Sequence, residues 1–218
     1  WSSSIATGDL GTFGGWTKAT VNAAGKTATE QTDYFGRTVD KIDYGAHDYN
    51  YSFNLAGRLV TRTNSAGESV AYSYYNTGLM ASIASTYDAG YSGSTATSTF
   101  RYDAEGNRTF EGHVVNGWKT NWQTGGTENY ATTHQQASVT WDAMNRMTSY
   151  VDPGTSSSPV NITWEYDLSS NIRRMKSVFR YMDAEGALAS TDTTQEYWYK
   201  YDNMNRFVTT KGMLSGTN

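Results

Sequence analysis

Acidic residues recur along this chain directly after an aromatic residue, and a carboxylate can serve as a general acid or base. The pattern is clearest at Tyr102-Asp103, Trp141-Asp142 and Tyr201-Asp202. A catalytic carboxylate is expected to be singular and to work beside a second group. Here the acid returns with the same neighbours each time, which favours a role in a repeated backbone turn over a role in catalysis.

The repeated unit has an anchor residue, usually aromatic, then Asp or Asn one position later and Gly or Asn four positions later. Seven copies have their anchors at positions 32, 53, 74, 102, 141, 166 and 201, in steps of 21, 21, 28, 39, 25 and 35 residues. Recurrence at such a period indicates a repeat architecture. The residues predicted to build its turns are Asp33, Gly36, Asn54, Gly57, Gly78, Asp103, Gly106, Asp142, Asn145, Asp167, Asn171, Asp202 and Asn205.

Turn chemistry explains the residue types in this unit. An Asp or Asn side chain accepts hydrogen bonds from nearby backbone N–H groups, and Gly or Asn tolerates a positive φ. Three copies depart from the pattern, because Thr32 replaces the aromatic anchor, Tyr75 replaces the acid and Ser170 replaces the Gly. These changes weaken single copies and leave the register of the repeat intact.

Apolar and aromatic residues alternate with other residues upstream of the anchors. Tyr197, Tyr199 and Tyr201 are spaced by two, which is the period of a β-strand, so they line one face. Each unit is therefore predicted to be a β-hairpin. Residues 172–182 resemble an amphipathic helix, but their alternation predicts another strand, with its turn at 183–186.

Composition favours a β protein. The chain has 218 residues, with 17 Tyr, 7 Trp, 7 Phe and 2 Pro, and a net charge of −4. The absence of cysteine excludes disulfides and thiolate metal sites, and the mild acidity argues against nucleic-acid binding. No apolar run approaches the roughly 18 residues that a membrane span needs. The chain begins with Trp and both ends resemble loops, so we expect it to be a piece of a longer protein.

Other catalytic and metal-binding motifs are not evident. His47, His113 and His134 are far apart in sequence, and each lacks a second ligand at metal-site spacing. The chain has no nucleophile elbow, phosphate-binding loop or zinc-protease helix motif. We therefore predict no catalytic residue, no metal site and no cofactor.

The best-formed copies of the unit are YDAEGNRT, FNLAGRLV, WDAMNRM and YDNMNRF, which begin at 102, 53, 141 and 201. They resemble the YD repeats of the rearrangement-hotspot (Rhs) family, over residues 32–207. The resemblance implies a long sheet of hairpins that winds into a hollow shell, as in Tc toxin B and C components and in teneurins. In the bacterial toxins such a shell encloses a C-terminal toxic domain.

The same resemblance bears on self-cleavage. In this family a cleaving segment near the end of the shell usually carries a pair of Asp-Pro-x-Gly motifs. Here Asp152-Pro153-Gly154 is a single, imperfect copy, so we interpret it as a loop between repeats. The chain is then expected to be an internal section without cleavage site or toxin.

The predicted organisation has four parts: a leading repeat or connection at 1–31, seven repeats at 32–207, a long insertion within them at 112–140, and a tail at 208–218. The predicted fold is all-β, with repeated antiparallel hairpins that form a curved, twisted sheet, part of a shell or solenoid-like barrel. Its aromatic faces are expected to stack from unit to unit.

Two functions are compatible with this organisation. The first is a non-catalytic shell section of a secreted bacterial toxin, whose partners are the rest of the chain and an enclosed toxin domain. The second is a cell-surface adhesion module that binds glycans or a receptor through Trp118, Trp122 and Tyr130, since exposed aromatic rings with nearby polar groups suit sugars. Packing of these aromatics on a neighbouring part of the sheet is the favoured alternative to binding.

Overall fold

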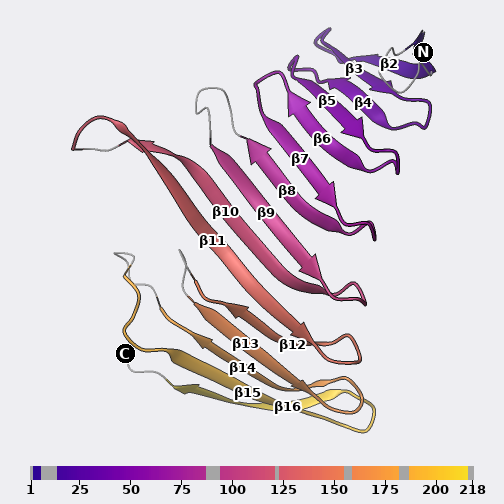
Figure 1. The fold of residues 1–218 in the computed structure, drawn as a ribbon. Coiled ribbons are helices and arrows are strands. Elements are labelled where there is room, and N and C mark those ends of the chain that lie inside the picture. Colours follow the sequence, from indigo (N-terminus) through magenta and orange to yellow (C-terminus); the bar gives the residue numbers. More distant parts are fainter. Residues whose placement is uncertain are drawn as a thin grey trace. The chain divides into compact units, whose positions relative to one another are not determined.

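The computed structural model describes residues 2–5, 14–86, 94–120, 123–154, 159–181 and 187–215. Sixteen strands follow one another in a single sheet in the order of the chain, from β1 to β16 (Figure 1). Every strand pairing given for them is antiparallel between consecutive strands. The all-β hairpin fold predicted from the sequence is confirmed.

The chain divides into two compact units, the first made of Trp1–Ala96 with Asn116–Tyr130 and the second of Thr97–Val115 with Ala131–Asn218. Eight strands belong to the first unit: β1 (Ser2–Ile5), β2 (Gly14–Val21), β3 (Thr27–Thr32), β4 (Thr38–Ile42), β5 (Asp48–Phe53), β6 (Leu59–Asn64), β7 (Ser69–Tyr74) and β8 (Met80–Thr86). Three strands contribute residues to both units: β9 (Thr95–Tyr102), β10 (Arg108–Thr120) and β11 (Thr127–Trp141).

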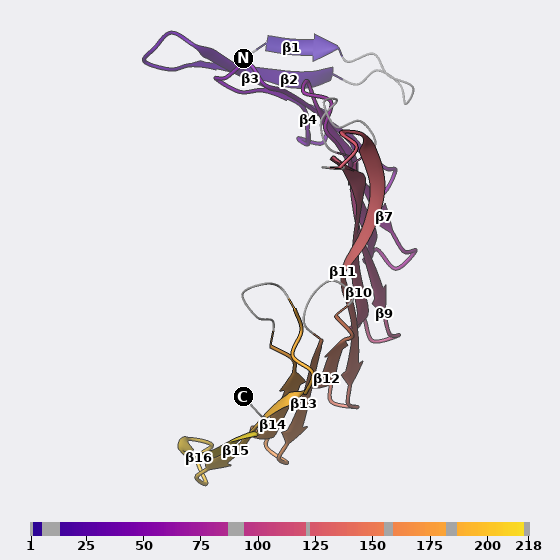
Figure 2. The same cartoon turned by 90° about the vertical axis from the view of Figure 1, so that its left-hand side faces the viewer.

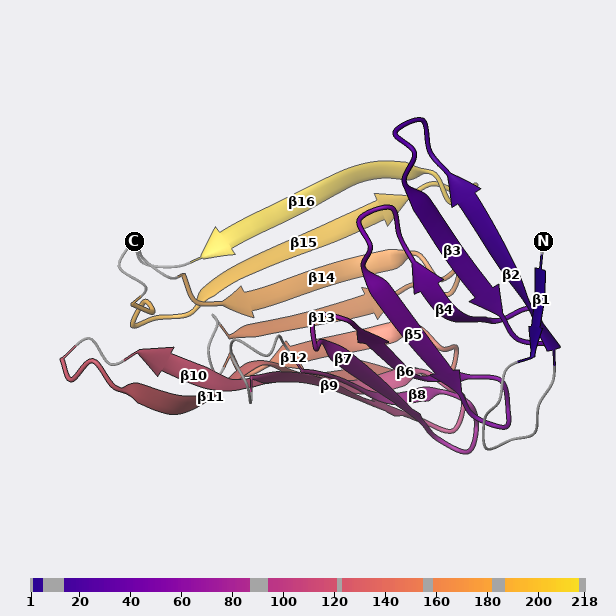
Figure 3. The ribbon, with the colours of Figure 1, turned by 90° about the horizontal axis from the view of Figure 1, so that it is seen from above.

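Five strands belong wholly to the second unit: β12 (Met147–Asp152), β13 (Val160–Tyr166), β14 (Ile172–Phe179), β15 (Thr193–Tyr201) and β16 (Phe207–Ser215). Viewed from above, β14, β15 and β16 run in alternating directions (Figure 3). The segment that resembles a helix in sequence is strand β14, and the predicted turn at 183–186 lies outside the described residues.

The repeated residues place the hairpin turns. Anchors pair with the residue six positions later, as Phe53 does with Leu59 and Tyr166 with Ile172. The register shifts immediately before these anchors, which is the signature of a β-bulge. The five intervening residues therefore form the loop, and the bulge gives the anchor its orientation.

Residues 112–140 are the predicted insertion between repeats. It forms most of the two longest strands, β10 and β11, which are neighbours in the sheet. The stretch Asp152-Pro153-Gly154 begins at the last residue of β12, where Asp152 Oδ1 accepts a hydrogen bond of 2.9 Å from the backbone N–H of Gly154. These residues therefore begin a connection between two strands.

The protein core is small. In the second unit, β13 to β16 appear edge-on as a single layer (Figure 2). Among the described residues, the buried apolar side chains are Ala96, Phe100, Ala137 and Val139, all on β9 and β11. Most aromatic side chains are only half-buried. Contacts within the sheet must therefore supply much of the stability that a two-layer core supplies in ordinary domains.

Candidate functional site

The repeat turns share one hydrogen-bond pattern, which Asp142 illustrates. Its Oδ1 accepts the backbone N–H groups of Met144 and Arg146, at 2.9 and 3.0 Å. Its Oδ2 accepts Arg146 Nε at 2.7 Å, so the carboxylate closes the turn with backbone and side chain together. The side-chain Oδ1 makes the corresponding pair of backbone bonds in the turns of Asp33, Asn54, Asp167 and Asp202.

The fourth position after each anchor has a positive φ. Gly36, Gly57, Gly78 and Gly106 have φ values of 77°, 76°, 93° and 87°, and Asn145, Ser170 and Asn205 have 57°, 66° and 58°. In the sixth copy the left-handed residue is Ser170, whereas Asn171 is the next residue and donates its amide to Asp167 Oδ2 at 3.0 Å. The serine therefore takes a conformation that Gly or Asn would occupy at lower cost.

The opposite ends of the hairpins use the same turn. Asn22 and Asp43 each accept backbone N–H groups two and four residues later, as the repeat acids do. Gly25 and Ala46 occupy the corresponding positions of positive φ. Sequence reasoning missed these two turns, although the Asx residue three positions before the left-handed one was a signal that could have identified them.

The anchor side chains connect successive repeats through hydrogen bonds. Tyr74 donates its hydroxyl to the carbonyl of Leu59 at 2.8 Å, and Tyr166 donates to Met147 at 2.7 Å. Each acceptor lies six residues after the preceding anchor. These bonds favour Tyr over Phe at the anchor, because the ring packs in the sheet while its polar tip has a partner.

A tryptophan anchor makes the equivalent contact. Trp141 Nε1 donates to the carbonyl of Arg108 at 2.9 Å, and Arg108 is again six residues after the preceding anchor. Indole carries one donor and no acceptor, so this carbonyl satisfies it fully. At these three anchors the aromatic ring carries a donor at its far end that bonds to the preceding repeat, and the sequence alone does not reveal this partner.

An arginine five residues after an anchor lies over the aromatic ring of the next anchor. The guanidinium carbon of Arg37 lies 4.7 Å from the ring centroid of Phe53, and that of Arg146 lies 4.5 Å from the ring of Tyr166. Arg58 makes the same contact with Tyr74 at 5.1 Å. At these distances a cation is attracted to the face of the ring. The predicted stacking of aromatics from unit to unit is, at these positions, a stack of arginine on aromatic.

The residue at the fifth position determines what fits in the following turn. Gly57 and Gly78 follow repeats with an arginine, and a Cβ on them would lie 3.3 and 3.1 Å from Nη1 of Arg37 and Arg58. Where the fifth residue is asparagine, the next turn has asparagine in place of glycine, and their side chains bond. These pairs are Asn107 with Asn145 at 2.8 Å and Asn171 with Asn205 at 3.0 Å.

Electrostatics keep the turn carboxylates ionised. The side-chain bond from Arg146 lowers the pKa of Asp142, and the side-chain bond from Asn171 lowers that of Asp167. At Asp33 burial raises the pKa, but the hydrogen bonds and charge of Arg37 outweigh it and the net pKa is lowered. A carboxyl group with a lowered pKa stays ionised, so it accepts hydrogen bonds well and donates a proton poorly. These groups therefore suit turn formation and not general acid catalysis.

One carboxyl group behaves differently. The pKa of Asp40 is raised, first by burial and then by the nearby negative charge of Asp48. Two interacting carboxyls can divide acid and base roles in an enzyme. Neither residue lines the hollows described below.

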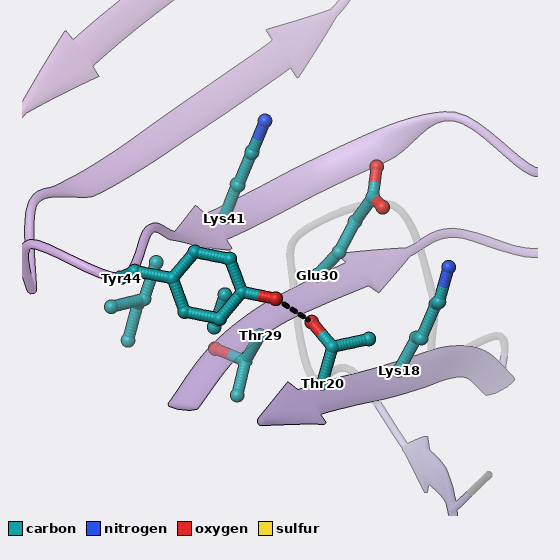
Figure 4. Close-up of a pocket in the computed structure, with 8 residues that line it drawn as sticks. Lys18, Thr20, Thr29, Glu30, Lys41 and Tyr44 are labelled. Carbon is teal, nitrogen blue, oxygen red and sulfur yellow. Dashed lines mark hydrogen bonds between the residues drawn. The ribbon is translucent and has the colours of Figure 1, made fainter. Parts of the chain in front are cut away.

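Two open hollows lie on the described surface. One of about 200 Å³ lies over β2, β3 and β4, where Tyr44 donates to Thr20 Oγ1 at 3.1 Å (Figure 4). Lys18, Glu30 and Lys41 are cross-strand neighbours there, so their charges alternate along the row. This arrangement is an ordinary stabilising charge pattern of a sheet face. A second hollow lies over β12, β13 and β14 and includes Pro153 and Asp192.

The three predicted ligand-binding aromatics are placed unequally. Trp118 lies on β10 with 42% of its surface exposed, and Tyr130 lies on β11. Trp122 lies outside the described residues. Among the side chains that the structure describes in this hairpin, Trp118 is the exposed tryptophan.

The histidines are arranged differently from the sequence interpretation. His47 Nδ1 lies 2.9 Å from Asp43 Oδ2, across a turn. His113 and His134, which are separated in the sequence, have ring centroids 5.9 Å apart on the neighbouring strands β10 and β11. Only the hairpin register brings them together, so no sequence spacing could have identified the pair. Within the described ranges, no group of three or more His, Cys, Asp or Glu side chains could hold a metal ion.

The search for membrane-spanning helices was negative for the described part of the chain. No helix there has both the length and the apolar character that a membrane crossing requires.

Comparisons with known proteins identify the fold. No family model matches the chain, and no curated protein matches its sequence. Among solved structures, the Tc holotoxin pore of Photorhabdus luminescens, with a mutation in TccC3, matches 87% of the chain with a TM-score of 0.57 and 10% sequence identity. The chain covers only 9% of that much longer chain. The described strands therefore have the fold of a section of this Tc toxin.

A second structure, the crystal structure of TcdB2-TccC3-TEV, aligns with 91% of the chain at 14% identity. The chain covers 11% of that chain, and the TM-score is 0.39. This alignment is too loose to carry an argument, so the inference about the fold rests on the holotoxin pore.

Proposed function

We propose that this chain is a non-catalytic wall section of a larger protein shell, and that the shell encloses and delivers a toxic polypeptide of a secreted bacterial toxin. The observation that carries the proposal is the contact between successive repeats. The anchor side chain of one repeat donates a hydrogen bond to the backbone carbonyl six residues after the preceding anchor, as Tyr166 does to Met147. The similarity of fold to a section of a Tc holotoxin supports the same role.

These contacts suit a wall. Each repeat adds two strands and presents the same donors and acceptors to the next, so a sheet can grow without limit in one direction. Backbone hydrogen bonds close the spaces between strands, and most of the described side chains are half-buried or exposed. A large surface with little core is suited to enclosing another chain. It is a poor scaffold for an enzyme site, which needs side chains held in a dry cavity.

The turn geometry supports the proposal that this section is non-catalytic. The repeated acids are engaged by backbone and side-chain donors, as Asp142 is by Arg146. The lowered pKa of Asp142 favours its ionised form, which has no proton to donate. We propose that their number reflects the number of turns in the wall.

The experiment uses the full-length product of the gene. It is purified natively, its polypeptides are weighed by mass spectrometry under denaturing conditions, and a parallel sample is treated with protease before denaturation. We expect a separate C-terminal polypeptide that co-purifies with the repeats and resists protease until they unfold. A single intact chain in which every segment is cut by protease would contradict enclosure.

A second candidate function is adhesion to glycans, and the observation that favours it is the exposure of Trp118 on β10. An exposed indole face can stack on a sugar ring. The test is a glycan array followed by titration of any hit with the Trp118→Ala variant. The exposed Trp198 of β15 provides a matched control, because Trp198→Ala removes a similar ring elsewhere. Equal loss of binding in both variants would point to non-specific adhesion.

A further inference from the structure

His113 and His134 form a pair of imidazoles on one hairpin. They belong to β10 and β11, and their ring centroids are 5.9 Å apart with 43° between the ring planes. His113 is half-buried and His134 is exposed, so both imidazoles can be reached from solvent. Two nitrogen ligands about 2.0–2.1 Å from a tetrahedral metal place their ring centroids roughly 5 Å apart. Small changes in the side-chain torsion angles of the two histidines would bring the rings from the observed separation to the one that a shared metal ion requires.

A neighbouring strand orients one of the two rings. Ser98 Oγ on β9 lies 3.0 Å from His113 Nδ1. When Nδ1 carries the proton it donates to the serine oxygen, and Nε2 then holds the free lone pair that a metal requires. Metal-ligating histidines commonly have such a partner on the other nitrogen, which orients the ring.

We propose that His113 and His134 bind a single divalent transition-metal ion of the kind that prefers imidazole, with Zn²⁺ as the representative. Water completes the coordination, since the described residues supply no third His, Cys, Asp or Glu at this place. Hard ions such as Mg²⁺ are not expected to bind, because they prefer oxygen ligands. A bound ion would link β10 to β11 and would stabilise the long hairpin that both strands form.

The third histidine provides an internal control. His47 lies on another turn, and its Nδ1 is 2.9 Å from a carboxylate oxygen of Asp43. The sequence contains 3 His and no Cys, so a transition metal has few alternative ligands. Substitution of His47 therefore removes one imidazole without touching the pair.

The experiment is a calorimetric titration of Zn²⁺ into the 218-residue chain, with Mg²⁺ as the comparison ion. We expect one Zn²⁺ per chain, and at least a tenfold loss of affinity in His113→Gln and in His134→Gln. Ser98→Ala should weaken binding about tenfold through the orientation of His113. The control His47→Gln should bind like the unchanged chain. Unchanged binding in both pair variants, or loss of binding in His47→Gln, would overturn the proposal.

A second measurement does not depend on the folding of variants. Imidazole NMR signals of the unchanged chain are recorded with and without Zn²⁺. The proposal expects two of the three histidines to shift together at one equivalent of metal, while the third stays in place. Equal shifts of all three signals, or none, would overturn it.

Discussion

At the scale of single residues, the Asp of a repeat turn can use its two carboxylate oxygens for two different bonds. One oxygen organises the backbone, and the other accepts the side chain four residues later, as Asp33 does from Arg37 Nε at 2.6 Å. In the second copy Asn54 stands in the place of Asp, so there is no second carboxylate oxygen to accept the side chain four residues later. Among the described side chains, the buried nitrogen atoms without a hydrogen-bond partner are Nε and Nη1 of Arg58, four residues after Asn54.

Asn54→Asp should therefore stabilise the protein. The new carboxylate would accept the free Arg58 Nε while its other oxygen keeps the turn bonds that Asn54 Oδ1 now accepts. We expect the free energy of unfolding to rise by about 1–2 kcal/mol at neutral pH, measured by urea denaturation. The reverse change Asp33→Asn is the matched control and should lower stability. No difference between Asn54→Asp and the unchanged chain would contradict the proposed role of the second oxygen.

The stability of the turns should also depend on pH. The pKa values of Asp33, Asp142, Asp167 and Asp202 lie below the ordinary value of 3.8 in the folded chain. The unfolded chain then binds more protons than the folded chain in acid, so stability is complete above about pH 5 and falls as the pH drops through 4 and below. Asp40, with its raised pKa, acts in the opposite direction and reduces the slope.

The measurement is the midpoint of urea unfolding, determined at a series of pH values from 7 to 3. Asp142→Asn keeps an acceptor for the turn but removes one titrating group, so its midpoint should change less steeply over the acid range. A slope equal to that of the unchanged chain would show that Asp142 does not contribute to acid sensitivity.

At the scale of elements, a donor at the tip of the anchor ring joins successive repeats at Tyr74, Trp141 and Tyr166. Tyr166→Phe removes the bond to the Met147 carbonyl at 2.7 Å and leaves the ring in place. We expect a loss of about 1–2 kcal/mol in the free energy of unfolding, because a half-buried carbonyl loses its partner. Tyr181→Phe is the control, since Tyr181 is 53% exposed. Equal effects of the two substitutions would show that the bond between repeats adds nothing.

The aromatic faces of the strands also contribute through packing. Sequence reasoning predicts that Trp164→Ala or Tyr199→Ala costs 3–5 kcal/mol, which is the range for a buried aromatic. Both side chains are half-buried in the structure, so we expect the lower end of that range. Thermal and urea unfolding of each variant would measure it. A melting curve unchanged by both substitutions would refute an aromatic contribution to stability.

At the scale of the whole molecule, the sheet is open, and its strand order ends at β1 and β16 without a further partner among the described strands. An unpaired edge strand is a template for another chain. The isolated chain should therefore associate as its concentration rises, which light scattering after size exclusion would detect. Val208→Lys on β16 should reduce association, because a charge on an edge opposes pairing.

The control for this prediction is Leu168→Lys. Leu168 is fully exposed at a turn between β13 and β14, away from the edge. Weaker association in Leu168→Lys but not in Val208→Lys would show that the chains meet through their turns and not through edge strands.

The sequence by itself determined the hairpins. Alternation of period two identifies a strand such as β15, and an Asx residue three positions before a left-handed Gly or Asn identifies a turn such as that of Asp202 and Asn205. These signals are local, since they reflect side-chain direction and the φ preference of single residues. Ser170 was harder to place, because its neighbours and not its own preference hold it at positive φ.

Only the tertiary structure decided which residues of different hairpins meet. Arg37 covers Phe53, Tyr166 bonds to Met147, and His113 lies beside His134. Each of these contacts depends on the register between strands, and a shift of one residue would turn every side chain to the other face. The register follows from the bulges and turn lengths of the assembled sheet, so composition and spacing cannot specify the contacts between repeats.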